Sequence, residues 1–237
     1  KAVAVNDLVL QLGKSTATGN IRVALENGIR ADVAVRMASL DADAFLAVSE
    51  TSRSQPASPG SVAPSSESSE AGADNRVVPA TPAPAFELPN DIEANIDLTI
   101  DEVVAMQDRI RAVRLAVSLK GGAITLNTLT ARFPGATELS ASGTLSAPKG
   151  ALTYAGKAAV RSTNLRRLLA WSGVDVSTVP ADRLRRFNVS TDVSGNSEQV
   201  QAAGIVAQLD ASRMSGGVTV ALRERAAFGA SFSIDQI

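Results

Sequence analysis

The chain has 237 residues, a formal net charge of −1 at pH 7, and neither cysteine nor histidine. These absences exclude thiol nucleophiles, disulfides, Cys/His zinc sites and the Ser–His–Asp triad, and the balanced charge argues against a nucleic-acid partner. Apolar residues make up 45% of the chain but aromatic residues only 3%, so we expect its apolar surfaces to be mainly aliphatic.

Residues 1–48 form the first predicted strand segment, because apolar and polar side chains alternate there with a period of two. Asn27-Gly28 is a typical hairpin turn, and residues 13–20 are predicted to be a polar turn. Residues 40–48 fit either the end of a strand or a short helix. The predicted strands of this segment cover residues 7–12, 21–25 and 29–37.

Residues 49–90 differ in composition, since they hold seven of the ten prolines among many Ser and Ala residues. Proline cannot donate to a strand ladder, and the segment has little apolar surface to bury. We therefore predict a disordered or extended insertion. A linker between two domains is an alternative, but the same alternation resumes after the segment, which favours a loop that interrupts one continuous sheet.

Residues 91–237 are predicted to be the main antiparallel array. Ile92, Ala94, Ile96, Leu98 and Ile100 alternate with polar residues, and short Gly- or Pro-containing turns join the strands that follow. The predicted strands cover residues 92–100, 110–119, 123–133, 138–145, 151–162, 188–193, 199–209, 214–222 and 228–234.

Two short helices are predicted within this array. The first covers residues 164–172, with Thr163 or Asn164 as its N-cap and Gly173 at its end. The second runs from Pro180 to Phe187, with the proline in its first turn. So few helices cannot cover about a dozen one-sided strands. The predicted fold is a curved, twisted, mainly antiparallel sheet, a half-barrel or groove with one or two short helices.

Several stretches, taken in the order in which they occur, resemble consecutive segments of one known protein family. AITLNTLTARFPGATELSASGTL at 123–145 is a strand, a short turn ending in Gly and a return strand. LRRLLAWSG at 165–173 follows as a helix, LDASRMSGGVTV at 209–220 as a strand pair, and FSIDQI at 232–237 as a last strand. Together they resemble the AsmA-like family, well over residues 91–237 and weakly over residues 1–48.

The resemblance implies a periplasmic, β-rich protein of a Gram-negative bacterium that supports outer-membrane biogenesis and lipid homeostasis. Family members are held by an N-terminal helix in the inner membrane, and the wider bridge-like lipid transfer group carries lipid along twisted β-sheet gutters. Because no apolar run here approaches the roughly 20 residues of a membrane span, such an anchor would lie outside this chain. The chain stops at Ile237 within a predicted strand, so we expect a segment of a longer protein.

Two function hypotheses follow from the alternation. In the first, the aliphatic face binds or conducts phospholipid or another acyl lipid; in the second, the face is a closed core and the chain is a structural or interaction scaffold for envelope proteins. A crystal structure would distinguish them by whether the face is open. The lipid-facing candidates are Ile96, Leu98, Val113, Leu115, Val117, Ile124, Leu126, Val218 and Val220.

Charged residues offer no catalytic pattern. Regular alternation of Asp91, Glu93, Asp97 and Asp101 predicts a water-facing side of the sheet. The sequence also contains no nucleophile elbow, P-loop or dinucleotide fingerprint. We therefore expect no enzyme activity, metal or cofactor. Trp171 is predicted to be a packing residue. The basic clusters could hold lipid head groups or form a solvated surface: Arg109, Arg111 and Arg114; Arg166 and Arg167; Arg183, Arg185 and Arg186.

Overall fold

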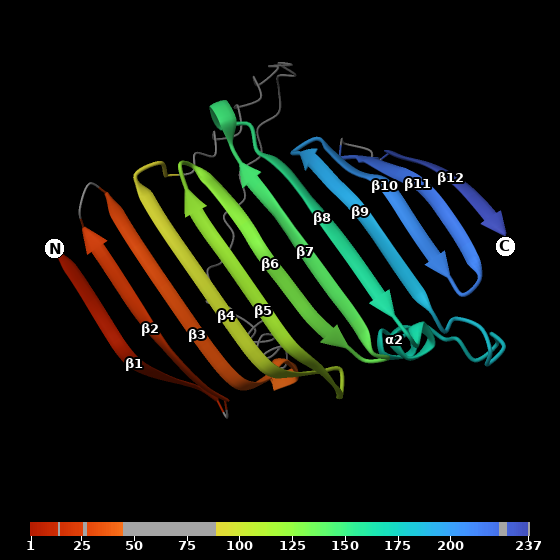
Figure 1. Cartoon of the computed structure of the whole chain (residues 1–237), viewed down its shortest axis with the longest axis horizontal. Coiled ribbons are helices and arrows are strands. Elements are labelled where there is room, and N and C mark those ends of the chain that lie inside the picture. The colour runs from red at the N-terminus through yellow and green to blue at the C-terminus, as the bar shows by residue number, and fades with distance from the viewer. Residues whose placement is uncertain (14, 26–27, 45–88, 223–226, 237) are drawn as a thin grey trace, which may run out of the picture.

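The computed structural model describes residues 1–13, 15–25, 28–44, 89–222 and 227–236. Its twelve strands form one sheet in which the order in space follows the order in the chain (Figure 1). The strands are β1 (Ala2–Leu12), β2 (Ser15–Leu25), β3 (Ile29–Asp41), β4 (Ile92–Ala105), β5 (Asp108–Lys120), β6 (Ala123–Phe133), β7 (Thr137–Ser146), β8 (Thr153–Ser162), β9 (Phe187–Asn196), β10 (Gln199–Leu209), β11 (Ser212–Ala221) and β12 (Ala227–Gln236).

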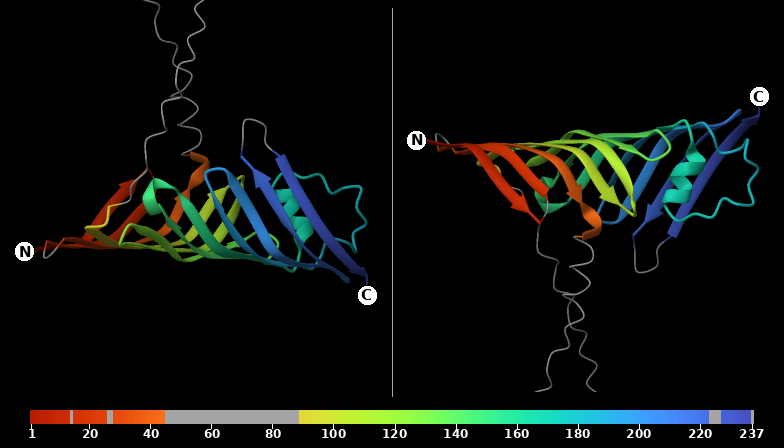
Figure 2. Two further views of the ribbon diagram at one scale, coloured as in Figure 1. Left: turned by 90° about the horizontal axis from the view of Figure 1, so that it is seen from above. Right: turned by 90° about the horizontal axis from the view of Figure 1, so that it is seen from below.

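The sheet is a single twisted layer that does not close into a barrel (Figure 2). Its edge strands β1 and β12 lie at opposite ends and each pairs with one neighbour. Within the part of the chain that the structure describes, extensive contacts between elements join only strands that are neighbours in the sheet. The predicted fold class, a mainly β sheet open as a half-barrel or groove, is confirmed.

One strand pair departs from the predicted antiparallel order. β3 and β4 are parallel, with Ile29 opposite Ile92 at one end and Asp41 opposite Val104 at the other. Parallel neighbours need a long connection, and residues 42–91 supply it. The segments before and after this connection therefore belong to one sheet. The predicted disorder of residues 49–90 falls almost entirely on residues outside those described.

The polar turn predicted for residues 13–20 is wrong for most of its length, because β2 begins at Ser15. Ala17 pairs with Leu10 of β1 and with Met37 of β3, and it is buried. The alternation continues through this stretch with small side chains, which were too weak a hydrophobic signal to predict a strand. Further along, residues 42–44 are helical, and residues 45–48 lie outside those described.

Helix α2 (Leu165–Trp171) forms where the first helix was predicted, and a single 3₁₀ turn, η1 (Pro148–Gly150), precedes β8. Asn164 is the N-cap, and its side-chain oxygen accepts a hydrogen bond from the Arg167 backbone N–H at 3.1 Å. Leu165 is buried, so the helix is held by packing as well as by its cap.

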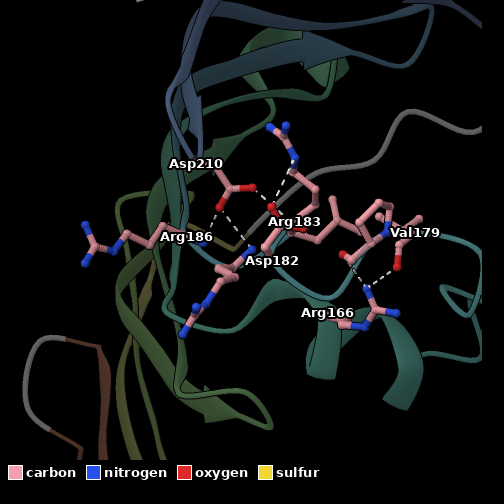
Figure 3. A network of polar contacts seen from close by, with 9 residues as sticks. Arg166, Val179, Asp182, Arg183, Arg186 and Asp210 are labelled. Atoms are coloured by element: carbon pink, nitrogen blue, oxygen red, sulfur yellow. Dashed lines mark hydrogen bonds and ion pairs between the residues drawn. The ribbon is translucent and has the colours of Figure 1, made fainter.

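The second predicted helix, Pro180–Phe187, is wrong: residues 181–184 form turns and bends. The backbone N–H groups of Leu184, Arg185 and Arg186 donate to the Asp210 carboxylate at 2.9, 3.0 and 2.9 Å (Figure 3). A carboxylate from the turn between β10 and β11 thus takes the donors that a helix would have used.

We expect Gly135→Ala to destabilise the fold by about 1–3 kcal/mol. Gly135 has φ +78°, and an added Cβ would collide with the Asn164 carbonyl oxygen at the start of α2. Gly121→Ala is the control, because Gly121 has φ +56° but nothing within 4 Å of the added Cβ. Urea unfolding followed by the fluorescence of Trp171, the one tryptophan of the chain, measures both. An equal loss of stability in the two variants would contradict a close contact between Gly135 and α2.

Candidate functional site: an open apolar face

A continuous row of apolar residues crosses the whole sheet. Cross-strand partners share a face, so following them from β1 to β12 traces one line of side chains. The row is Val5, Ile21, Val33, Ile96, Val117, Leu126, Gly143, Gly156, Val193, Ala202, Val218 and Ala230. Eleven strand spacings make this row roughly 50 Å long.

A second row on the same face runs beside it, two residues away from the first in each strand. It consists of Val3, Val23, Ala31, Ala94, Leu119, Ile124, Leu145, Tyr154, Gly195, Val200, Val220 and Phe228. We call the side of the sheet that carries these two rows the apolar face. Neither row contains a charged residue.

The opposite side, which we call the polar face, carries a contrasting row between these two. It consists of Ala4, Arg22, Asp32, Asn95, Ser118, Thr125, Thr144, Ala155, Ser194, Gln201, Thr219 and Gly229. The sheet therefore presents one aliphatic and one water-compatible surface along its entire width, as expected for strands that alternate with a period of two.

Irregularities in three strands keep the apolar face continuous. Where the register shifts in β1, β6 and β10, successive apolar-face residues are three positions apart, not two: Val5 and Leu8, Leu126 and Leu129, Ala202 and Ile205. The extra residue in β1 is near Asp7, with φ 56°, and in β10 near Gly204, with φ 58°. Without such bulges the remaining part of each strand would turn its apolar side chains to the polar face.

The apolar face is largely uncovered by the described residues. Ile96, on the fourth strand β4, is 43% exposed, and on the edge strands Val5 is 45% and Phe228 84% exposed. Most other apolar-face residues are half-buried, because neighbouring side chains shield one another. The buried apolar residues are few and include Ala17, Met37, Ile100, Ala131 and Ala207 on the strands and Leu165 and Val176 near α2. The closed core of the second hypothesis is not formed by the described chain.

Helix α2 covers one end of the apolar face. Phe133 ends β6 on this face, and its ring lies 5.7 Å from the ring of Trp171. The Trp171 Nε1–H donates to the Ala105 carbonyl at 3.1 Å, which joins the helix to the end of β4. At the start of the helix, the buried Thr137 hydroxyl donates to Ser162 Oγ at 2.7 Å, and the same oxygen accepts from the Asn164 backbone N–H at 3.3 Å. Trp171 is thus a packing residue, as predicted, and α2 closes this end.

The middle of the apolar face has a shallow depression of about 310 Å³ between β6 and β9. Gly143 and Gly156 are cross-strand partners there, and larger side chains, including Leu126, Tyr154 and Val193, surround them. A Cβ on Gly143 would lie 2.9 Å from the Gly156 Cα, so neither position has room for a side chain. The small residues of β7 and β8 are the sequence signal for this depression. It was overlooked because the candidate lining residues were chosen among large aliphatic side chains.

All nine lipid-facing candidates lie on the apolar face. Seven form a continuous patch over β4, β5 and β6: Ile96, Leu98, Val113, Leu115, Val117, Ile124 and Leu126. Val218 and Val220 lie apart from this patch, on β11, but in the same two rows. The structure thus brings the first seven together, and their contact with lipid stays a prediction.

The basic clusters serve different purposes. Arg166 donates to the carbonyls of Val179 and Pro180 at 2.7 and 3.1 Å (Figure 3). It also donates to the Val176 carbonyl at 2.7 Å, so it holds the loop after α2. Arg167 pairs with Asp108 at 3.0 Å. Arg109 and Arg111 pair with Glu102, and Arg183 pairs with Asp182. Arg185 and Arg186 donate their backbone N–H groups to Asp210. Arg114 lies on the polar face.

Acidic residues on the polar face form ion pairs between strands. Glu93 lies 2.8 Å from Arg30 of β3 and 3.4 Å from Lys120 of β5. Its hydrogen bond with Arg30 is the main cause that lowers the pKa of Glu93, followed by that with Lys120. Asp101 similarly pairs with Arg36 at 3.2 Å. These contacts support the interpretation of the alternating acids as a structural, water-facing surface.

The other lowered carboxyl pKa values also have local structural causes. The pKa of Asp108 is lowered first by the Arg109 backbone N–H, and that of Asp175 by the Ser177 backbone N–H. Within the described residues, no group of three or more His, Cys, Asp or Glu side chains could hold a metal ion. None of the described helices has the length and hydropathy needed to cross a membrane.

Comparisons of the chain with protein families, with characterised proteins and with solved structures find no match.

Proposed function

We propose that this chain is a non-enzymatic periplasmic segment of an AsmA-like protein and that its apolar face holds acyl chains of phospholipid. The observation that carries the proposal is the pair of apolar rows that cross all twelve strands. The described residues place no second layer over them beyond α2 at one end. An exposed apolar surface of this extent is costly in water, so an apolar partner that covers it gains free energy.

Acyl chains suit the chemistry of this face. The side chains are mainly aliphatic and offer no regular set of hydrogen-bond partners. They therefore favour an apolar ligand and do not recognise a particular arrangement of polar groups. Covering an aliphatic side chain contributes at most about 1.5–3 kcal/mol to the free energy of lipid binding, and less where the side chain is already half-buried. Lipid head groups would remain in water at the margins of the sheet. The order of the AsmA-like motifs supports the periplasmic assignment and a role in outer-membrane lipid homeostasis.

Lipid analysis of the purified chain tests the proposal. We expect mass spectrometry of an organic extract to find co-purified phospholipid, and we expect the stripped protein to take up a fluorescently labelled phospholipid. The absence of both would count against the proposal. A surface that instead binds envelope proteins, as the scaffold hypothesis requires, would yield a lipid-free protein that forms a stable complex with a protein partner.

A further inference from the structure

A second hollow lies on the polar face, where β5, β6, β7 and β8 meet. This depression has a volume of about 540 Å³ and is lined by the side chains of Arg114, Arg132 and Arg161, with one acidic residue, Glu138. We call it the arginine depression. Three guanidinium groups against one carboxylate leave it with an excess of two positive charges, in a chain whose net charge is −1.

The register of β5 and β6 brings the arginines to one face. Arg111 and Arg114 are three residues apart and would alternate in a regular strand. Ala112 has φ 50°, and the β5–β6 register shifts between Arg111 and Arg114. As a result Arg111 lies opposite Arg132, and Arg114 lies opposite Thr130, two residues before Arg132 on the same side of β6.

Ion pairs neutralise only part of this cluster. Arg132 pairs with Glu138 at 3.1 Å, and Arg111 is 3.8 Å from Glu102, which also pairs with Arg109. Arg114 and Arg161 form no ion pair within the described residues. Like charges that lie directly opposite each other, as Arg111 and Arg132 do, destabilise a strand pair unless an anion offsets them.

The other end of the polar face is different, because its charges are matched. Arg30 and Lys120 share Glu93, Arg36 pairs with Asp101, and the Asn95 amide donates to Asp32 at 2.8 Å. An excess of positive charge is therefore a local property of the arginine depression and not of the polar face in general.

We propose that the arginine depression binds a phosphate-class oxyanion. Guanidinium groups form paired, charge-assisted hydrogen bonds with phosphate oxygens, and groups converging from β5, β6 and β8 could surround such an anion. Thr130, Ser140 and Asn188 also line the depression and add hydroxyl and amide donors. The site faces away from the apolar rows, so this proposal is independent of lipid binding there.

Calorimetric titration of the whole chain with inorganic pyrophosphate tests the site. We expect binding that weakens with added salt, and a loss of about tenfold or more in affinity for the double variant Arg114→Ala/Arg161→Ala. The matched control, Arg22→Ala/Arg36→Ala, removes the same charge from the polar face at β2 and β3 and should bind as the wild type does. Glu138→Gln should bind more tightly, a gain that misfolding cannot produce.

Vesicle flotation identifies the source of the phosphate. Vesicles of phosphatidic acid in phosphatidylcholine should retain the wild type better than Arg114→Ala/Arg161→Ala if the anion is a lipid head group. Equal retention, together with pyrophosphate binding that requires both arginines, would identify a soluble phosphate compound. No pyrophosphate binding, or equal weakening by the control double variant, would overturn the proposal.

Discussion

Replacing Val117 and Leu126 together with glutamate is expected to weaken phospholipid binding by about tenfold or more. These two residues are cross-strand partners in the middle of the apolar face, on β5 and β6. The substitution removes two aliphatic side chains and places two carboxylates beneath any bound acyl chain, where they would lose water without gaining a partner. Uptake of a fluorescently labelled phospholipid by the purified variant measures the loss.

The sheet offers a closely matched control. Ser118 and Thr125 are the adjacent cross-strand pair on the same two strands, but they face the polar side. Ser118→Glu/Thr125→Glu therefore introduces the same charge at nearly the same place, and we expect lipid uptake to stay at the wild-type level. Circular dichroism establishes that both double variants retain their strands. Equal lipid uptake by the two variants would show that the apolar face is not the binding surface.

Much of the sheet could be predicted because alternation with a period of two is a direct consequence of strand geometry. The bounds of β6, Ala123–Phe133, and of β10, Gln199–Leu209, match the predicted strands residue for residue. The same logic placed all nine lipid-facing candidates on one face, since residues two apart in a strand share a side. Alternation says which side chains lie together, but it cannot say whether another layer covers them.

The parallel pairing of β3 with β4 could not be predicted from the alternation. Both parallel and antiparallel neighbours place Val33 and Ile96 on the same face, and the choice depends on the path of residues 42–91. Those residues have no periodic pattern from which a path could be derived. The sequence signal therefore specified the strands and their faces, but not the direction of this one pair.

The bulges left a signal that was overlooked. Apolar spacing changes from two to three between Leu126 and Leu129, and a regular strand would have put them on opposite faces. A change of spacing inside one strand is thus a usable indication of a bulge. The arginine depression lacked such a signal, because Arg161 is almost fifty residues from Arg114 and only the register of four strands brings them to one hollow.

Removing the Asp210 carboxylate should release the loop between α2 and β9. The carboxylate accepts hydrogen bonds from three consecutive backbone N–H groups, and without it Leu184, Arg185 and Arg186 lose their acceptor. We expect Asp210→Ala to lower the free energy of unfolding by about 2–3 kcal/mol, since hydrogen bonds to a charged group are strong. Limited trypsin digestion should then cleave faster after Arg183, Arg185 and Arg186.

Asp182→Ala is the control for this experiment, because Asp182 lies in the same loop but is largely exposed and only 3.8 Å from Arg183. It removes the same charge without removing an acceptor from the backbone, so trypsin should cleave it at the wild-type rate. Equal cleavage of Asp210→Ala and the wild type would mean that the loop is held by other contacts, such as those of the Arg166 guanidinium.

The same contacts determine how the loop responds to acid. The Arg186 backbone N–H is the largest cause that lowers the pKa of Asp210 below its ordinary value of 3.8, and the N–H groups of Arg185 and Leu184 add to it. Because the folded-state pKa is depressed, the stabilisation is fully present above 3.8 and is lost as the pH falls through the folded-state value. Urea unfolding should therefore separate the wild type from Asp210→Ala near neutral pH, and the difference should shrink below pH 3.8. A difference that stayed constant through this acidic range would mean that the ionised carboxylate is not what holds residues 184–186.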